Sequence, residues 1–203
     1  MYYIGPVLIV PKRRNPLKKI LILNGSPRKK GNTAVLADQL IAGAKELGAE
    51  VEHVFLHGLD IHPCDACDYC QEGGRGCIIR DDMQDLYPKM LASDTIVIAS
   101  PVYWYSMTAQ TKLCVDRWYV LESSDDFELK GKKLSLLMVY GDKDLYSSGG
   151  ITVIYTLEGI CRYVGMEFDG IVHGSAMNIG DVFNDKDLME QALQLGKMLG
   201  TPG

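Results

Sequence analysis

The strongest constraint on the fold is the alternation of five short apolar segments with segments of helical periodicity. The apolar segments lie at 18–24, 51–56, 94–100, 131–141 and 166–174, and the helical patterns at 32–48, 81–93, 106–121, 150–164 and 185–199. Apolar strands separated by helices are typical of a parallel sheet covered on both faces, because both sides of each strand are then buried. The sequence therefore predicts an α/β protein with a five-stranded parallel sheet.

Size and composition fit one domain of this kind. A chain of 203 residues with 47% hydrophobic and 23% charged residues can bury one substantial core. The net charge of −5 gives no reason to expect a nucleic-acid partner. We find no repeat and no linker, so we expect residues 18–203 to form one domain. An extended N-terminal arm over residues 1–17, punctuated by three prolines, precedes it and is a candidate for packing on a neighbouring subunit.

The apolar segments are too short to span a membrane, and this bears on the expected cellular location. None reaches the roughly 18–20 residues of a membrane span. The apolar start MYYIGPVLI comes before the basic PKRR, which is the reverse of a secretory signal. We therefore expect a cytoplasmic protein with no membrane partner. Its six cysteines are then expected to be free thiols or metal ligands rather than disulfides.

The first chemical motif is NGSPRKKGNT at 24–33, directly after the first strand. Ser26 and Thr33 supply hydroxyls, and Arg28 can form a charge-assisted bond to a phosphate oxygen. A helix begins beyond them, and its N-terminus favours an anion. The alternative is an ordinary turn, since Gly, Ser, Pro and Asn are common turn residues. The motif is neither G-x-G-x-x-G nor G-K-[ST], so a mononucleotide phosphate is the favoured ligand.

The second motif is SPVYWYSMTAQTKLCVDR at 100–117, after the third strand. Tyr103, Trp104 and Tyr105 are consecutive. Three aromatic side chains in one loop indicate that they pack against a ligand or another protein surface. A flat ligand ring, a dimer interface and simple packing are all compatible with this pattern. The carboxyl ends of parallel strands meet at one edge, where ligands bind in such sheets, so we expect the two motifs to lie there.

Together, the two loops resemble the NAD(P)H-dependent FMN reductase family of flavodoxin-like proteins, over about residues 18–173. The cysteine-rich segment that runs into IIRDDM is similar to the iron–sulfur flavoprotein branch of that family. The resemblance implies a flavodoxin-like three-layer α/β/α fold with strand order 2-1-3-4-5. It also implies that FMN binds at the ends of strands one, three and four.

The resemblance assigns residues to this cofactor site. The residues that would hold the FMN phosphate are Ser26, Arg28, Asn32 and Thr33. The residues that would border the ribityl chain and the ring are Pro101, Val102, Tyr103 and Trp104. The segment Tyr140, Gly141 and Asp142 would approach the other edge of the ring, although this loop departs from the Gly-rich form of the family.

The implied activity is that of an FMN-dependent oxidoreductase that takes electrons from NAD(P)H. The acceptors would be free flavin, quinone-like compounds or an iron–sulfur centre, and the protein would act as a homodimer or homotetramer. One alternative is a non-enzymatic electron carrier between protein partners, and a second is a flavin-free structural or regulatory module that keeps the fold. Hydride transfer to a flavin requires no acid–base side chain. We therefore assign no catalytic residue, and interpret His57, His62 and His173 as surface or structural residues.

Four cysteines follow the spacing C-x2-C-x2-C-x6-C, which resembles compact iron–sulfur runs more than paired zinc knuckles. Cys64, Cys67, Cys70 and Cys77 are thus candidate ligands of one [4Fe–4S] cluster, with Gly73, Gly74 and Gly76 giving the last interval freedom to fold back. The alternative is a loop without a cluster, used for packing or subunit contact. Asp81 or Asp82 is expected to cap the next helix. Cys114 and Cys161 lie on predicted helices and are expected to be buried.

Overall fold

The computed structural model describes residues 17–72, 76–122 and 127–202. The predicted arm, apart from Leu17, lies outside the described residues, as do Gly73 and Gly74. The strands are β1 (Lys19–Asn24), β2 (Glu50–Phe55), β3 (Thr95–Pro101), β4 (Lys133–Tyr140) and β5 (Glu167–Ser175). The helices are α1 (Asn32–Glu46), α2 (Met83–Ala92), α3 (Ala109–Asp116), α4 (Gly150–Val164) and α5 (Lys186–Gly200), with 3-10 helices η1 (Arg117–Leu121) and η2 (Asp181–Asn184).

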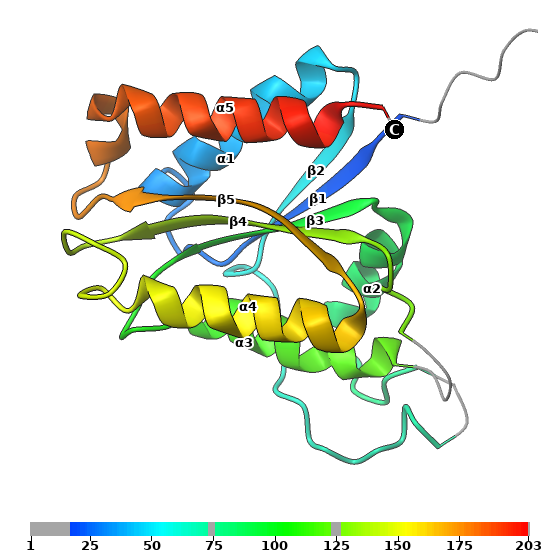
Figure 1. Cartoon of the computed structure of the whole chain (residues 1–203). Coiled ribbons are helices and arrows are strands. Elements are labelled where there is room, and N and C mark those ends of the chain that lie inside the picture. The colour runs from blue at the N-terminus through cyan, green and yellow to red at the C-terminus, as the bar shows by residue number, and fades with distance from the viewer. Residues whose placement is uncertain (1–16, 73–75, 123–126, 203) are drawn as a thin grey trace, which may run out of the picture.

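The five strands form one parallel sheet in the order β2-β1-β3-β4-β5. Helices α1 and α5 cover one face of this sheet, and α2, α3 and α4 cover the other (Figure 1). The predicted fold class and strand order are therefore confirmed, as a flavodoxin-like three-layer α/β/α domain.

Strand β1 shows why the apolar segments are continuous rather than alternating. Ile20 and Ile22 belong to the core under α1 and α5, whereas Leu21 and Leu23 belong to the core on the opposite face. Successive side chains of a strand point to opposite faces, so a sheet covered on both sides requires apolar residues at every position.

Helices α1 and α5 approach each other closely at glycines. A Cβ atom added at Gly43 would lie 2.1 Å from the carbonyl oxygen of Leu193, and one at Gly196 would lie 2.0 Å from that of Leu40. Both distances are far below a van der Waals contact, so the packing of these helices depends on the absence of a side chain at both positions.

The predicted helix over 106–121 is shorter and broken in the structure. Helix α3 begins at Ala109, because the side chain of Thr108 accepts a hydrogen bond from the backbone N–H of Thr111 and caps the helix. It ends at Asp116 and continues as the 3-10 helix η1. Among the described residues, no helix is long and apolar enough to cross a membrane.

Candidate functional site

The loops that follow β1, β3 and β4 meet at the carboxyl edge of the sheet and enclose a pocket of about 350 Å³. Nine of the ten residues predicted to bind the cofactor line it: Ser26, Arg28, Asn32, Thr33, Pro101, Val102, Tyr103, Tyr140 and Gly141. The other lining residues are Gly31, which belongs to the motif at 24–33, and Val139, Ala176 and Met177, which the sequence did not indicate. We call this cavity the first pocket. Trp104, the tenth predicted residue, lines an adjoining cavity instead.

Two side-chain hydrogen bonds within the loop between β1 and α1 fix its conformation beside the first pocket. The buried side chain of Asn24 accepts a hydrogen bond from the N–H of Ser26 at 2.9 Å, and the Ser26 hydroxyl accepts one from the N–H of Arg28 at 3.2 Å. Helix α1 then begins at Asn32, and no side chain of the described residues caps it. The first-turn N–H groups of this helix are therefore available to an anion, and the exposed guanidinium of Arg28 adds a positive charge.

Gly25 fixes this loop against the start of α3. A Cβ atom at Gly25 would lie 1.9 Å from Oγ1 of Thr111 and 2.5 Å from Oγ1 of Thr108. The Thr108 hydroxyl donates to the carbonyl oxygen of Gly25 at 2.9 Å, and the N–H of Gly25 donates to Ala99 at 2.8 Å. Only glycine fits here, and the close contact holds the first two loops of the site at a set separation.

Asn32 lines the first pocket, and its side chain is hydrogen-bonded to the loop after β5. Its amide nitrogen donates to the carbonyl oxygen of Asn178 at 2.7 Å, and its Oδ1 accepts from the N–H of Gly180 at 2.8 Å. The side chain thus holds the loop after β5, which forms a wall of the pocket through Ala176 and Met177. The side chain of Asn32 therefore positions this wall, and its backbone N–H is one of the uncapped first-turn N–H groups of α1.

The loop after β3 forms a two-residue hairpin. Tyr103 and Ser106 exchange backbone hydrogen bonds of 2.8 and 3.1 Å, and the residues between them have positive φ angles, +48° at Trp104 and +64° at Tyr105. This geometry is that of a type I′ turn. The turn directs Trp104 away from the first pocket to an adjoining cavity of about 380 Å³, here called the second pocket. Its lining residues are Trp104, Tyr105, Gly141, Asp142, Ser147, Ser148 and Met177.

Tyr140, on the third side of the first pocket, is paired with a histidine. The Tyr140 hydroxyl lies 3.0 Å from Nδ1 of His173. Burial lowers the pKa of His173. Burial, and then the negative charge of Asp144, raises the pKa of Tyr140. Both side chains are therefore neutral near pH 7, and they supply polar structure beside the pocket without adding charge.

The other histidines lie in hydrogen-bonded positions outside the first pocket. Nδ1 of His57 lies 3.1 Å from Nε2 of Gln110 in an exposed contact. Nε2 of His53 lies 3.1 Å from the amide nitrogen of Asn24. Burial lowers the pKa of His53, although the charge of Asp38 opposes this shift. His53 therefore supports the loop between β1 and α1 through its contact with Asn24, a role that the sequence did not indicate.

The cysteine loop is open in the structure. Cys64 and Cys67 are exposed, and Cys70 and Cys77 are half-buried. Within the described ranges, no three Cys, His, Asp or Glu side chains are grouped closely enough to hold a metal ion. The four sulfur atoms therefore do not form a ready-made cluster site in this conformation. Cys114 and Cys161 are buried as predicted, and burial raises the pKa of both thiols to about 12.

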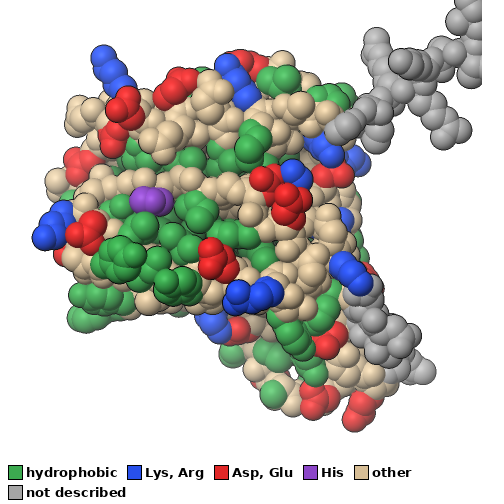
Figure 2. Space-filling model, in the orientation of Figure 1, with side chains coloured by type: hydrophobic (Ala, Val, Ile, Leu, Met, Phe, Trp, Pro, Cys, Tyr) green, Lys and Arg blue, Asp and Glu red, His purple; other side chains and the backbone are tan. Residues whose placement is uncertain are grey.

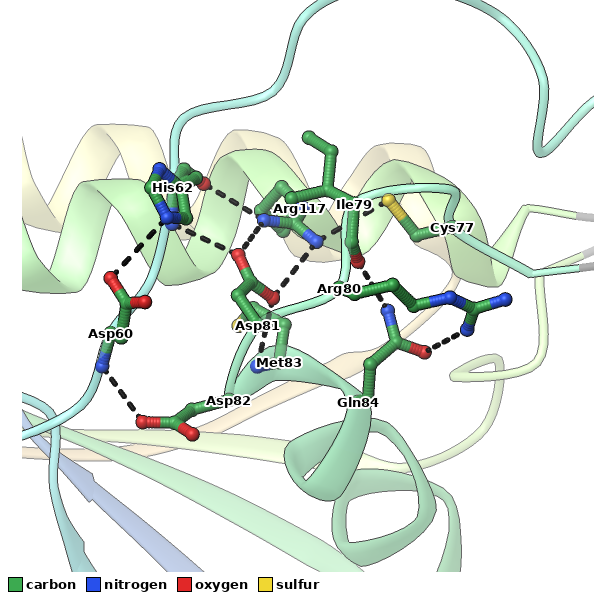
Figure 3. A network of polar contacts seen from close by, with 10 residues as sticks. All are labelled: Asp60, His62, Cys77, Ile79, Arg80, Asp81, Asp82, Met83, Gln84 and Arg117. Atoms are coloured by element: carbon green, nitrogen blue, oxygen red, sulfur yellow. Dashed lines mark hydrogen bonds and ion pairs between the residues drawn. The ribbon is translucent and has the colours of Figure 1, made fainter.

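A buried arginine joins the two ends of the cysteine loop (Figure 3). Arg117 forms a bidentate ion pair with Asp81, with N–O distances of 2.5 and 3.2 Å. It also donates to the carbonyl oxygen of His62 at 2.8 Å and to Sγ of Cys77 at 3.3 Å. Oδ1 of Asp81 accepts from the N–H of Met83 at 3.1 Å, which is the predicted cap of α2. Arg117 was not among the predicted functional residues, and its sequence position, between Asp116 and Trp118, carries no signal that it is buried.

Comparison with known proteins gives concordant results. The model of the family described as NADPH-dependent FMN reductase matches residues 18–170. YwqN of Bacillus subtilis, named as an NAD(P)H-dependent FMN-containing oxidoreductase, is 29% identical over 184 residues, which cover 88% of this chain and 97% of that protein. The iron–sulfur flavoprotein MJ1083 of Methanocaldococcus jannaschii is 30% identical over 187 residues, or 88% and 94% of the two chains. The solved structure of the Trp repressor binding protein from Bacillus subtilis superposes with a TM-score of 0.66 at 29% identity, covering 87% of this chain and 99% of that one.

Proposed function

The chain belongs to the NADPH-dependent FMN reductase family, and from this premise we propose that it passes electrons from NAD(P)H to free flavin or quinone-like acceptors. It is an oxidoreductase that uses FMN, as its family implies. The observation that carries the proposal is that loops from three strands line one pocket with a cationic, N–H-rich end at Arg28 and an apolar wall at Val102 and Val139. This division matches a ligand with a phosphate at one end and a flat ring at the other.

The residues of the first pocket bind and orient the cofactor. When bound, FMN accepts a hydride and can release electrons singly or in pairs. Arg28 and the first-turn N–H groups of α1 would hold its phosphate. Val102 and Tyr103 would lie along its apolar part, and the contact of Gly25 with Thr108 keeps that wall at a set distance from the phosphate end.

The direct test is anaerobic stopped-flow reduction of the FMN-loaded protein. We expect NADH or NADPH to bleach the flavin absorbance, and a quinone to restore it. The variant Arg28→Ala is expected to retain less FMN, and Lys30→Ala is its control, because Lys30 is a neighbouring cation that does not line the pocket. If neither nucleotide bleached the flavin, the reductase proposal would be wrong.

A second candidate is an electron carrier that exchanges electrons with protein partners through FMN and a [4Fe–4S] cluster. The names of relatives favour it, as do the four cysteines on one loop and the Arg117 N–H group beside Cys77. The loop would have to draw its sulfur atoms together to bind a cluster. Reduction of the flavin by ferredoxin, without reduction by either nicotinamide nucleotide, would favour the carrier.

Anaerobic purification with iron and sulfide analysis tests the cluster itself. About four irons per chain are expected if one [4Fe–4S] cluster is present. The variant Cys70→Ser should then lose the iron and keep FMN, whereas Asp65→Asn, in the same loop, should keep both. Iron at the background level in wild-type protein would exclude the cluster.

We also propose assembly as a homodimer or homotetramer. Hydrophobic side chains gather over α4 on the face shown in Figure 2. Tyr155 and Tyr163 on this helix are both largely exposed. Exposed apolar patches of this kind are typical of protein–protein contacts. Light scattering should give a mass of two or four chains, and a monomer would contradict the proposal.

A further inference from the structure

Asn24, at the end of β1, is held by two hydrogen bonds on opposite sides of its amide. The side chain is fully buried, its Oδ1 accepts from the N–H of Ser26 at 2.9 Å, and its Nδ2 lies 3.1 Å from Nε2 of His53 on β2. The N–H of Ser26 can only donate, so Oδ1 has to face it, and Nδ2, a donor, has to face the histidine. Nε2 of His53 must therefore accept, which fixes this imidazole in the neutral form with its proton on Nδ1.

These contacts connect the edge strand β2 to the cationic end of the first pocket. The Ser26 hydroxyl accepts from the N–H of Arg28 at 3.2 Å, and both residues line that pocket. His53 and Asn24 do not line it. A histidine outside the pocket is thus joined, through one buried amide, to the loop that carries the pocket's cation.

The surroundings of His53 hold its ring and set its charge. His53 and Phe55 share the face of the sheet that α1 covers, and their ring centroids are 4.5 Å apart. Glu52 points to the opposite face and pairs with Lys89 of α2. From α1 the charge of Asp38 favours protonation of His53, but burial has the larger effect and lowers the pKa of the imidazole. The ring is therefore neutral near pH 7.

Protonation of His53 breaks this arrangement. Its Nε2 then carries a proton, so two donors face each other across the 3.1 Å contact. The Asn24 amide can accept from the imidazolium only by turning its Oδ1 toward it. The buried N–H of Ser26 then loses its acceptor. Because a buried N–H group without a partner is destabilising, the loop between β1 and α1 has to move.

We propose that neutral His53 is a positioning residue for the cofactor: through Asn24 it fixes the loop between β1 and α1 for the phosphate of FMN, and its protonation weakens FMN binding. The inference rests on the proposed binding of that phosphate in the first pocket, and deepens it by naming a residue outside the pocket that regulates it. The direction of the effect distinguishes two causes. An imidazolium that acted through its charge alone would attract the phosphate and strengthen binding at low pH.

The test measures the Kd of FMN from about pH 8 to about pH 5 in wild type, His53→Gln and His57→Gln. A glutamine amide can accept from Asn24 at every pH in this range. As pH falls, we expect Kd to rise about fivefold more in wild type than in His53→Gln, since one hydrogen bond is worth about that factor. The phosphate of FMN titrates near about pH 6, but it does so in all three proteins alike. His57→Gln, which removes an exposed histidine of the following loop, should keep the wild-type profile.

Riboflavin, which has no phosphate, should bind with the same pH dependence in wild type and His53→Gln. Identical FMN profiles in these two proteins would overturn the inference, and so would tighter FMN binding by wild type at low pH. A difference between the two proteins that is as large for riboflavin as for FMN would assign His53 to the stability of the whole fold instead.

NMR of the imidazole nitrogens in FMN-free wild type tests the contact without any substitution. We expect the proton of neutral His53 on Nδ1, and the backbone amide signal of Ser26 to shift as His53 titrates. A proton on Nε2, or a Ser26 signal that does not follow the titration, would contradict the arrangement. This measurement is independent of the proposed function, whose own failure would appear as FMN binding that is unchanged in Arg28→Ala.

Discussion

At the scale of single residues, the Arg117–Asp81 ion pair holds the two ends of the cysteine loop together. Both side chains are almost fully buried, at 1% and 0% exposure. The Asp81 carboxylate also accepts from the N–H of His62 at 2.9 Å, so the loop entrance and the start of α2 share one anion. A buried ion pair of this kind adds little more to the free energy of unfolding than well-packed apolar side chains would. Removing one partner, however, leaves the other as an uncompensated buried charge.

We therefore predict a large loss of stability in Asp81→Asn. The free energy of unfolding should fall by about 3–5 kcal/mol, because Arg117 remains charged and buried. The matched control is Asp116→Asn, which removes an exposed i,i+4 ion pair with Lys112 of the same 2.5 Å length. That change should cost less than about 0.5 kcal/mol. Urea denaturation of both variants measures the two values, and similar losses would contradict the assignment.

The same pair predicts the pH dependence of stability. Burial alone would raise the pKa of Asp81, but hydrogen bonds from Arg117 and from the His62 N–H outweigh it and hold that pKa below its ordinary value. The stabilisation is therefore present above the unfolded-state pKa of about 3.9 and is lost as pH falls below it. The stability difference between wild type and Asp81→Asn should accordingly shrink below about pH 4. A difference that is constant down to pH 2 would exclude this explanation.

At the scale of elements, helices α1 and α5 contact each other backbone to backbone. The glycines at positions 43 and 196 face carbonyl groups of the opposite helix at distances that exclude a methyl group. This contact places α5 across α1 and fixes the loop before α5, from which Asn178 and Gly180 bind Asn32. The helix pair thus supports one wall of the first pocket from outside it.

Two Gly→Ala variants separate this contact from helix propensity. Gly196→Ala should destabilise the protein by at least about 1–3 kcal/mol, because the added methyl group overpacks the interface. Gly159→Ala, at a half-buried position of α4 with no atom within 4 Å of the added Cβ, should stabilise it by up to about 1 kcal/mol. Thermal and urea unfolding measure both. A neutral Gly196→Ala would show that the helices separate without cost.

At the scale of the whole molecule, the site is assembled from loops that span the chain from Ser26 to Met177. A ligand that binds only the assembled site must stabilise the entire fold. FMN at about 100 times its Kd should add about 2.7 kcal/mol to the free energy of unfolding. For a chain of this length, that corresponds to a rise in Tm of about 5–10 °C.

Riboflavin is the control for this linkage, because it has the ring and the ribityl chain but no phosphate. At the same concentration it should raise Tm less than FMN in wild-type protein. In Arg28→Ala the difference between the two ligands should narrow, since part of the phosphate site is removed. Equal rises in Tm with both ligands in wild type would show that Arg28 and the first-turn N–H groups of α1 do not bind phosphate. Differential scanning fluorimetry measures all four combinations.

The sequence by itself determined the elements and the edge at which the site lies. The apolar segments predicted all five strands, with bounds within one or two residues, because strands buried on both faces must be apolar throughout. The motifs at 24–33 and 100–117 follow strands β1 and β3, and parallel strands necessarily end at the same edge. The strand order and the cofactor came from the resemblance to a family, which the comparisons confirm.

Only the tertiary structure decided what the individual side chains do at that edge. Asn32 meets Gly180 across 148 positions of sequence, and Arg117 meets Asp81 across 36. The turn at Trp104 depends on room provided by Gly149, and it moves that side chain from the predicted pocket to its neighbour. Periodicity reports which face of an element is buried, but hydrogen-bond partners, close backbone contacts and buried charges depend on which distant segments the packing brings together.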